Sequence, residues 1–329
     1  MNETGVGVSY AGYFVIYHVF IKREYVGEKM ELKRLISLRN ETQGILDRYR
    51  DAFKICQIET KDELRCLLAG ANKNVIKDSG EIKKEPKENV EEDDGAGLSE
   101  TLLIAATDET IHLGQEFHVA TIAYHNPQIK GQRLSGVEWS VEGFEEVDAA
   151  FLKRAYQRYH HIPWTIAETK RCVIKELTLE DIDGLFELYQ DKELTKYTEP
   201  LFEYEEEREY QRAYINNMYR YFGYGMWLVF HKESGEIIGR AGLEHREYHG
   251  QTEVELGYLI APKYQKKGYA TEVCLAIIDF YKEELDFPRL NCLIEEGNTS
   301  SMKLAEKLGF SYMETIVEQG RNMLRFVRK

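Results

Sequence analysis

The chain of 329 residues has a mass of 38.4 kDa, and 43% of its residues are hydrophobic while 30% are charged. This composition excludes a disordered chain, and the length predicts two domains, each large enough to bury its own core. The 57 acidic residues outnumber the 43 basic ones and give a formal net charge of -14. Because phosphate neutralisation needs clustered Lys and Arg, nucleic acid is not expected as a partner.

The five cysteines are odd in number, widely spaced and free of any CxxC pair, and His160 and His161 have no metal-ligand companion at helical spacing. We therefore expect neither a disulfide framework nor a metal site, and a reducing cytoplasm fits best. The longest early apolar run, residues 13–21, is far shorter than the roughly 20 residues of a bilayer span. No small-residue cleavage site follows a basic start, so a cytoplasmic protein without a membrane anchor is expected.

In chain order, residues 32–68 show helical spacing but carry no recognisable chemistry. Residues 77–97, KDSGEIKKEPKENVEEDDGAG, follow with many charges and almost no apolar residue. Such a segment buries too little surface to offset the entropy of ordering it, which predicts a linker or insertion. A solvated charged helix is the alternative.

The next segments alternate between strand and helix patterns. Strands are predicted at residues 101–108, 121–126 and 137–144, and helices at residues 109–120 and 145–161. This βαββα order predicts a smaller, partial Rossmann-like α/β domain within residues 1–165. With Asp108 at a strand end and Gly114 and Ala120 after it, the order resembles the C-terminal half of haloacid-dehalogenase-like hydrolases.

That family uses an aspartate nucleophile, with a second aspartate two residues later, at a strand end. The D-x-D of this chain, Asp181 and Asp183, instead falls at the start of a predicted helix, where Thr178 and Asp181 form a capping pair. We therefore expect residues 1–165 to be a degenerate relative. A phosphatase that uses Asp108 is the alternative.

A second α/β region is predicted at residues 170–329. Its strands are expected at residues 172–177, 225–231, 236–247, 252–261, 289–296, 310–318 and 322–328. Its helices are expected at residues 179–191, 205–222, 268–285 and 300–309.

Between the strand at 252–261 and the helix at 268–285, residues 265–270 form the pattern Q-x-x-G-x-A. Such a turn points backbone N–H groups outward at the positive end of a helix dipole, and Gly268 and Ala270 let a bulky pyrophosphate approach. A plain strand-to-helix turn is the alternative. Neither the G-x-G-x-x-G of a Rossmann site nor the G-K-[ST] of a P-loop is present.

This turn resembles the acetyl-CoA pyrophosphate loop of the GNAT acetyltransferase superfamily. Its companion motifs are ELGY at residues 255–258, N-x-x-S at residues 298–301 and EKLGF at residues 306–310. Together they are similar to those of the ribosomal-protein alanine N-acetyltransferases, over residues 171–329. The resemblance implies acetyl-CoA as co-substrate and a mixed α/β sheet that splays between its fourth and fifth strands.

The same resemblance implies which residues hold acetyl-CoA. The backbone of Tyr258, Leu259 and Ile260 would pair with the pantetheine amides, and a strand N–H there would hold the thioester carbonyl. The pyrophosphate would lie against the loop and the helix start, which comprise Gln265, Lys266, Lys267, Gly268, Tyr269, Ala270 and Thr271. Asn298 and Ser301 complete the set, and a helix cap is a second interpretation of this pair.

An amine with a pKa of roughly 9 to 10 is mostly protonated at neutral pH, so its attack on the thioester needs a base. Strand alternation puts Glu253 and Glu255 on one face. We rank Glu255 first as the base and Glu244, on the preceding strand, second, with the proton moving through water. Ordinary cross-strand ion pairs with Lys or Arg are the alternative.

Many superfamily members place a tyrosine seven residues after the asparagine of the N-x-x motif, where it protonates the leaving thiolate. In this chain Ala305 stands at that position. Because a thiol with a pKa of about 8.5 is a moderate leaving group, Ser301, Tyr312 or solvent is expected to suffice as the acid.

Residues 199–209 hold six acids and one base in front of a long helix. They would attract a cationic amine, or they reflect the preference of helix starts for Glu. We expect N-acetyl transfer from acetyl-CoA to a primary amine of a protein N-terminus or a small molecule, by direct attack in a ternary complex, since no nucleophile–base pair is recognisable. An acyl-CoA sensor without turnover is the alternative, and a monomer or homodimer is expected.

Overall fold

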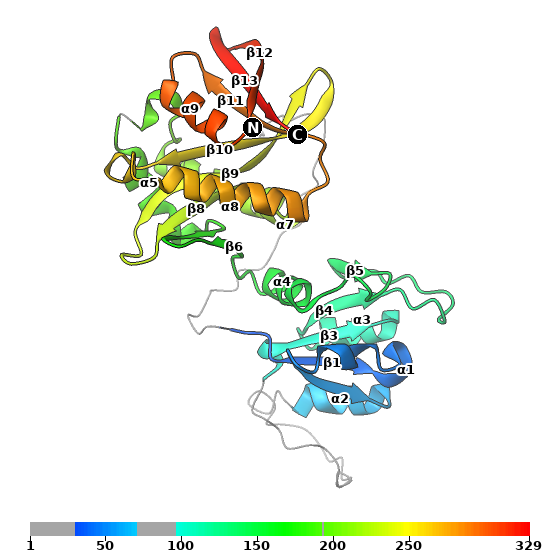
Figure 1. The fold of residues 1–329 in the computed structure, drawn as a ribbon. Helices are drawn as coiled ribbons and strands as arrows, with labels where there is room; N and C mark the ends of the chain where they lie inside the picture. The colour runs from blue at the N-terminus through cyan, green and yellow to red at the C-terminus, as the bar shows by residue number, and fades with distance from the viewer. Residues whose placement is uncertain (1–29, 71–96, 193) are drawn as a thin grey trace, which may run out of the picture.

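The computed structural model describes residues 30–70, 97–192 and 194–329. They form two α/β units, one built on a five-stranded sheet and one on an eight-stranded sheet (Figure 1). Of the charged segment predicted at residues 77–97, all but Gly97 lies outside the described residues. Within the described ranges, no helix is long and apolar enough to cross a membrane.

The first sheet is parallel, with the strand order β2-β1-β3-β4-β5. Its strands are β1 (Arg34–Leu38), β2 (Lys54–Ile58), β3 (Thr101–Ala105), β4 (Ala120–Tyr124) and β5 (Trp139–Val141). Its helices are α1 (Arg39–Thr42), η1 (Ile45–Tyr49), α2 (Lys61–Gly70), η2 (Leu98–Glu100), α3 (Asp108–Glu116) and α4 (Ala149–Tyr159). Apolar side chains of α2 and α3 pack on one face and those of η1 and α4 on the other, which confirms a Rossmann-like layer.

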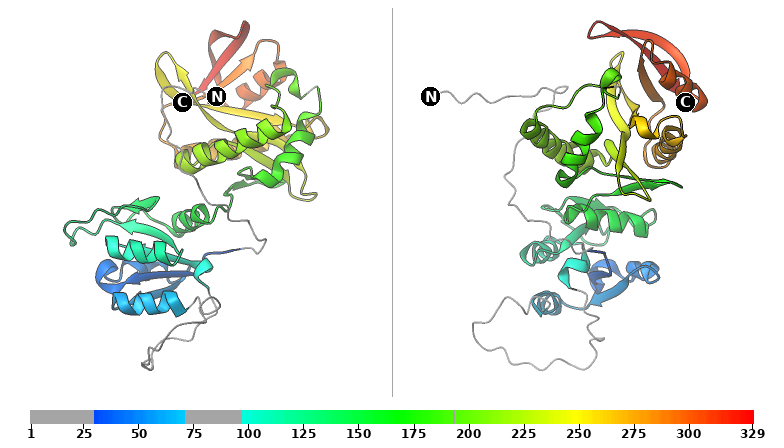
Figure 2. Two further views of the ribbon diagram at one scale, coloured as in Figure 1. Left: turned by 180° about the vertical axis from the view of Figure 1, so that it is seen from behind. Right: turned by 90° about the vertical axis from the view of Figure 1, so that its left-hand side faces the viewer.

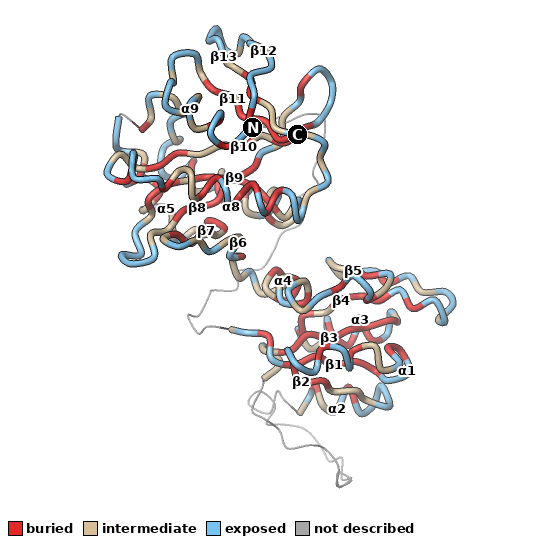
Figure 3. Tube along the Cα trace, viewed as in Figure 1, coloured by how far each residue is buried: buried red, intermediate tan, exposed pale blue. Residues whose placement is uncertain are grey.

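The helical spacing expected throughout residues 32–68 is wrong, because this stretch supplies the two strands β1 and β2 between its helices. All five residues of β1, RLISL, are buried, as the tube in Figure 3 shows for the middle of both sheets. A short, fully buried run has no periodicity that separates a strand from a helix. The layer is therefore a complete five-stranded sheet rather than a partial one, although β5 is shorter than the strand predicted at 137–144.

The second sheet is mixed, with the order β12-β13-β11-β10-β9-β8-β7-β6, and its β10–β11 pair is parallel while the others are antiparallel. Its strands are β6 (Thr165–Glu168), β7 (Cys172–Lys175), β8 (Met226–His231), β9 (Ile237–Tyr248), β10 (Gln251–Ile260), β11 (Leu290–Glu295), β12 (Ser311–Glu318) and β13 (Arg321–Arg328). Its helices are η3 (Leu179–Asp181), α5 (Ile182–Tyr189), η4 (Thr195–Tyr197), α6 (Tyr204–Tyr214), η5 (Ile215–Tyr219), α7 (Arg220–Phe222), η6 (Pro262–Tyr264), α8 (Tyr269–Glu284) and α9 (Thr299–Lys307). Helices α8 and α9 cover one face and α5 to α7 the other (Figure 2).

Two features of this unit depart from the sequence prediction. Strand β6 was not predicted, and it extends the sheet back to Thr165. The long helix predicted at residues 205–222 is broken by the π-helical turn η5 between α6 and α7. Tyr214 and Tyr219, at the two ends of that turn, both hydrogen-bond the backbone of Met226, and a π turn brings residues five apart onto one helix face.

A buried ion pair joins the two units. Arg158 of α4 donates to both carboxylate oxygens of Glu176, at 3.1 and 2.8 Å, and the Trp164 N–H donates to the same carboxylate at 2.9 Å. The two charged side chains are 7% and 2% exposed, and the guanidinium lies 3.8 Å from the centre of the Trp164 ring. Glu176 therefore compensates a cation that has little access to water.

Replacement of Glu176 by Gln would leave Arg158 buried without its counter-charge. We expect the free energy of unfolding to fall by about 3 kcal/mol, the lower end of the range for a broken buried pair. Chemical denaturation followed by tryptophan fluorescence measures the change. The control is Glu168→Gln, which removes an exposed pair with Lys232 and should cost less than about 1 kcal/mol. Equal losses in the two variants would contradict the assignment.

Candidate active site

The parallel pairing of β10 with β11 is limited to Val254–Leu290 and Glu255–Asn291. On its other side β10 stays paired with β9 as far as Ile260–Gly239. From residue 256 to residue 260, this edge of β10 thus has no strand partner among the described residues. The predicted splay between the two strands is confirmed.

The backbone groups on the open edge follow from the alternation of an antiparallel ladder. The Ala261 N–H donates to the Ile238 carbonyl at 2.8 Å, so that residue faces β9. Alternation then turns the N–H and C=O of Leu259 toward β9 and those of Tyr258 and Ile260 toward the open edge. This corrects the expectation that the Leu259 backbone would also face the pantetheine.

The strand leads through η6 into the Q-x-x-G-x-A turn at residues 265–270. Gly268 has φ +86° and is the N-cap residue of α8, which has no side-chain cap, whereas α3, α4 and α9 are capped by Thr107, Asp148 and Asn298. The first N–H groups of α8 therefore remain free of a capping side chain, at the positive end of the helix dipole. An anion that approaches this turn meets those donors.

Arg171 holds this loop in place, and the sequence analysis did not identify it. Its backbone N–H and Nε donate to the Glu272 carboxylate at 2.8 and 2.7 Å, and its Nη1 donates to the Lys267 carbonyl at 3.0 Å. The guanidinium also lies 3.8 Å from the centre of the Tyr269 ring. Because nearly 100 residues separate Arg171 from the loop, no local pattern could indicate the contact.

The two candidate bases, Glu255 and Glu244, stand directly opposite each other in the β9–β10 ladder. Oε2 of Glu255 accepts from Arg246 Nε and from the Tyr248 hydroxyl, each at 3.0 Å, so the cross-strand ion pair that was the alternative to a base does exist. Burial raises the pKa of Glu255, Arg246 opposes the rise, and the negative charge of Glu244 adds to it. Glu244 is exposed, and its side chain has no hydrogen bond or ion pair with any described residue.

Glu253 shares the face of Glu255 as predicted, but its carboxylate is fully engaged. It accepts from Arg325 Nη2 at 2.8 Å and from Asn291 Nδ2 at 2.9 Å, and Arg289 lies 3.6 Å away. Asn291 also donates to the Val254 carbonyl at 3.0 Å. This buried polar network ties β10, β11 and β13 together where β10 and β11 still pair.

On the other face of β10, the Tyr258 hydroxyl donates to Ser301 Oγ at 3.1 Å. Asn298 Oδ1 accepts from the Ser301 N–H at 3.2 Å, which confirms the predicted helix cap. Ala305 is buried one turn further along α9. Tyr312 lies on β12, separated from β10 by two strands, and its exposed hydroxyl bonds Thr315, so the structure does not bring it to the open edge.

The acidic segment at residues 199–209 runs into the start of α6, and five of its six acids are exposed while one is buried. Glu207 is buried and accepts from the Phe202 N–H at 3.0 Å and from Gln211 Nε2 at 2.6 Å. Glu205 and Glu206 are exposed in the first turn of α6, where the helix dipole favours acids. The helix dipole thus accounts for the three acids in the first turn of α6, and attraction of a cationic amine by this run stays a prediction.

In the first unit, β2 lies on one side of β1 and β3 on the other, so the connections that leave these central strands run in opposite directions. Rossmann-like sheets bind ligands at such a point, between β1 and β3 in this chain. The buried carboxylate of Glu41 occupies this point and accepts from the Ala106 N–H at 2.6 Å and from the hydroxyls of Thr107 and Thr110 at 2.9 and 2.6 Å. The backbone N–H and the hydroxyl groups that could donate to a phosphate at this point therefore already donate to the Glu41 carboxylate.

Asp108 lies exposed at the first position of α3 and accepts from the Arg133 N–H at 3.3 Å. Thr178 and Asp181 form the predicted capping box, and Asp183 accepts from the Tyr204 hydroxyl at 2.7 Å. Within the described part of the chain, no group of three His, Cys, Asp or Glu residues is arranged to hold a metal ion. These positions lend the phosphatase alternative no support.

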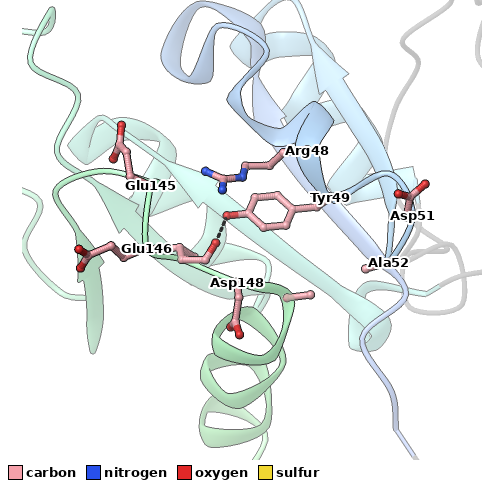
Figure 4. Close-up of a pocket in the computed structure, with 9 residues that line it drawn as sticks. Arg48, Tyr49, Asp51, Ala52, Glu145, Glu146 and Asp148 are labelled. Carbon is pink, nitrogen blue, oxygen red and sulfur yellow. Dashed lines mark hydrogen bonds between the residues drawn. The ribbon is translucent and has the colours of Figure 1, made fainter. Parts of the chain in front are cut away.

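A surface hollow of the first unit lies between the end of η1 and the loop before α4 (Figure 4). The Tyr49 hydroxyl donates to the Val147 carbonyl at 2.6 Å, and the Arg48 guanidinium donates to the Phe144 carbonyl. Asp148, on its rim, caps α4 through the Phe151 N–H. The polar groups of this hollow thus hold the loop before α4 in place. No residue of the 265–271 segment lines the hollow.

Comparison with known proteins agrees with this geometry. The model of the acetyltransferase (GNAT) domain matches residues 171–311. The uncharacterized Bacillus subtilis protein YkkB is 30% identical over 142 residues, which are 43% of this chain and 82% of YkkB. The uncharacterized N-acetyltransferase p20 of Bacillus licheniformis is 28% identical over 144 residues, 43% of this chain and 80% of p20.

Among solved structures, the Salmonella typhimurium acetyl transferase that modifies the N-terminal serine of ribosomal protein L7/L12 is similar, with a TM-score of 0.42. Its identity to this chain is 17%, over 50% of this chain and 96% of its own length.

The fold, the family model and the curated relatives define an α/β acyltransferase. The chain belongs to the acetyltransferase (GNAT) family and is an acetyl-CoA-dependent N-acetyltransferase, with the matched residues in the unit of the eight-stranded sheet. The open edge of β10 and the uncapped start of α8 fit acetyl-CoA, because they offer amide partners for its pantetheine arm and donors for its pyrophosphate. The resemblance of residues 101–161 to haloacid-dehalogenase-like hydrolases stays a hypothesis.

Replacement of Gly268 by Glu should weaken acetyl-CoA binding. The change puts a side chain on a residue with φ +86° and a negative charge at the anion-binding turn. We expect the Kd from calorimetry to rise at least about tenfold, which corresponds to about 1.4 kcal/mol. Gly320→Glu is the matched control, since that glycine also has positive φ but lies in the open β12–β13 turn. An unchanged Kd in Gly268→Glu would contradict the assignment.

Proposed function

We propose that the protein transfers the acetyl group of acetyl-CoA to a primary amine by direct attack within a ternary complex. The observation that carries this proposal is the open edge of β10. At one end it reaches the uncapped start of α8, and at the other it adjoins Glu255 on the same strand. A cofactor laid along this edge would therefore present its thioester close to a carboxylate.

The backbone of the edge supplies the donors that acyl transfer needs. The N–H groups that alternate toward the open side would pair with the pantetheine amides and hold the thioester carbonyl oxygen. A donor fixed at that oxygen stabilises the negative charge that develops when the amine attacks. Such a donor requires no particular side chain, which agrees with the small number of candidate catalytic side chains.

The two thiols near the open edge are buried and protonated, which favours direct attack by the amine over an acyl-enzyme intermediate. Cys274 and Cys292 lie beside Tyr258 and are buried. Burial raises the pKa of both thiols, which disfavours the thiolate that an acyl-enzyme route would need. The amine itself is then the nucleophile.

Glu255 is the proposed base, acting through water. A base works best when its pKa approaches the operating pH, and burial moves the pKa of Glu255 in that direction. Its Oε2 is held by Arg246 and Tyr248, which orients the carboxylate and leaves Oε1 for the water. Glu244, exposed and directly opposite, would attract the ammonium form of the acceptor.

The acceptor is proposed to be a protein N-terminus or a small cationic amine. The motifs at residues 255–258 and 298–301, similar to those of ribosomal-protein alanine N-acetyltransferases, make N-terminal peptides the first acceptors to test. Release of free coenzyme A, with mass spectrometry of the product, measures turnover across a panel of peptides and small amines. Turnover with an amine supports the proposal. Tight acetyl-CoA binding without turnover for any amine would favour a sensor instead.

The base assignment predicts a large loss on Glu255→Gln. We expect kcat/KM to fall by about a hundredfold or more, within the range for a lost general base, while the Kd of acetyl-CoA is unchanged. Glu247→Gln, an exposed acid on β9, is the control and should keep its activity. Equal activity of Glu255→Gln and wild type would contradict the role.

Two further variants should move the acidic limb of the pH profile in opposite directions. The base acts deprotonated, so kcat/KM rises with pH through its pKa. Glu244→Gln removes a negative charge and should lower the pKa of Glu255, which shifts this limb to lower pH. Arg246→Gln removes a positive charge and should shift the limb to higher pH. The part of the pH profile that reports deprotonation of the acceptor amine should be the same in both variants. Loss of all activity in Glu244→Gln would contradict the assignment and indicate that Glu244 is the base.

A further inference from the structure

The turn between β8 and β9 contacts the Q-x-x-G-x-A turn near both of its ends. His231 ends β8, and Ser234 and Glu236 follow it in the connection to β9. Tyr264 lies directly before the Q-x-x-G-x-A turn, and Tyr269 lies within it as the first residue of α8. Hydrogen bonds join the first three residues to the last two, so a segment that precedes the candidate anion-binding turn in the chain supports it.

The carboxylate of Glu236 is the first acceptor in this set of hydrogen bonds. It accepts from the Tyr264 hydroxyl at 2.6 Å, from Lys263 Nζ at 2.9 Å and from Ser234 Oγ at 2.8 Å. These hydrogen bonds, led by the one from Tyr264, lower the pKa of Glu236 to about 2, so the carboxylate is charged at neutral pH. The proton of the Ser234 hydroxyl is therefore committed to Glu236.

The direction of the Ser234 hydrogen bond assigns the tautomer of His231. Nδ1 of His231 lies 3.1 Å from Ser234 Oγ and must be the donor, because that hydroxyl already donates to the carboxylate. In the neutral ring, Nε2 is then an acceptor. The Tyr269 hydroxyl, 3.1 Å away, donates to this nitrogen. The chain of hydrogen bonds thus ends on the first residue of α8.

The Tyr269 side chain is held at its ring as well as at its hydroxyl. The Arg171 guanidinium lies 3.8 Å from the ring centre, and the rings of Tyr264 and His231 meet it edge-on, with centres 5.4 and 5.8 Å away. These contacts leave Tyr269 buried. Because Tyr269 directly follows the N-cap residue Gly268, contacts that fix it also fix the direction of the first free N–H groups of α8.

We propose that His231 is a positioning residue for the pyrophosphate of acetyl-CoA, acting through the hydroxyl of Tyr269. The inference rests on the proposed function, which places the pyrophosphate at this helix start. Donors that are already aimed at an anion lose less conformational entropy on binding, so the affinity is higher than that of a mobile turn. The pantetheine arm and the thioester would lie along β10, away from this contact. Loss of His231 should therefore weaken binding of the nucleotide half of the cofactor selectively.

The test compares two thioesters in a double-mutant cycle of His231→Phe and Tyr269→Phe. S-acetylpantetheine carries the same thioester and arm as acetyl-CoA but lacks the phosphates. Calorimetry measures the Kd of acetyl-CoA, and competition against acetyl-CoA measures the Kd of S-acetylpantetheine. We expect each single variant to raise the Kd of acetyl-CoA about fivefold, the equivalent of one hydrogen bond, and the double variant to raise it no further. The Kd of S-acetylpantetheine should be unchanged in all three variants.

Two further variants serve as controls. His231→Gln keeps a side-chain donor and a side-chain acceptor and should retain most of the wild-type affinity for acetyl-CoA. Tyr281→Phe removes a hydroxyl near the other end of α8, where it bonds the Phe287 carbonyl at 2.7 Å, and its Kd should equal that of wild type. If His231→Phe does not fold, the comparison of Tyr269→Phe with Tyr281→Phe still decides whether the hydroxyl contact contributes to binding.

Four results would overturn the inference. A wild-type Kd of acetyl-CoA in His231→Phe would remove the positioning role, and additive losses in the double variant would show that the two residues act independently. An equal rise in Kd for both thioesters would mark a general structural effect. Wild-type protein that binds both thioesters equally would contradict the placement of the pyrophosphate at α8 and the inference with it. Tight acetyl-CoA binding without turnover of any amine would instead contradict only the proposed acetyl transfer, so the two failures are distinguishable.

Discussion

The site depends on one constraint, which is that β10 and β11 pair over two residue pairs and then separate. The separation creates an edge of backbone without a strand partner in the middle of a sheet, where such groups are normally paired. On this edge the Ile260 carbonyl accepts from Gln265 Nε2 at 2.8 Å. A buried network of Glu253, Asn291 and Arg325 holds the strands at the point where pairing ends. Because every member of this network is hydrogen-bonded, it anchors the fork at a defined position.

Successive side chains of a β-strand point to opposite faces of the sheet, which separates the candidate reacting groups on either side of that edge. Side chains of Glu253 and Glu255 project to one face of β10, and the side chain of Tyr258 projects to the other, toward α9. In the proposed reaction, the base Glu255 would approach a thioester at the edge from one of these two faces. The same strand leads through η6 into the turn at Gly268, so in the proposed complex it would position both the cofactor and the reacting groups.

The first unit has the layered architecture of a nucleotide-binding sheet, but its own carboxylate fills the point where such sheets bind anions. The Glu41 carboxylate accepts hydrogen bonds from the backbone N–H of Ala106 and from two threonine hydroxyls at the start of α3. The contact of this unit with the acetyltransferase unit includes Arg158 and Glu176, which pair away from water. The contact between the units that is described here is thus a buried charge pair, in which loss of either partner would leave an uncompensated charge.

The sequence alone indicated the family, a candidate cofactor loop and the order of most elements in residues 170–329, because short motifs and strand or helix periods are local properties. It also placed Glu255, Glu244 and Ser301 among the candidates. Only the tertiary structure revealed the clamp of Arg171 on the loop, the hydrogen bond between Tyr258 and Ser301, and the strands hidden in residues 32–68. These features join residues far apart in the chain, or lie in buried runs without periodicity, and side-chain packing across elements decides them.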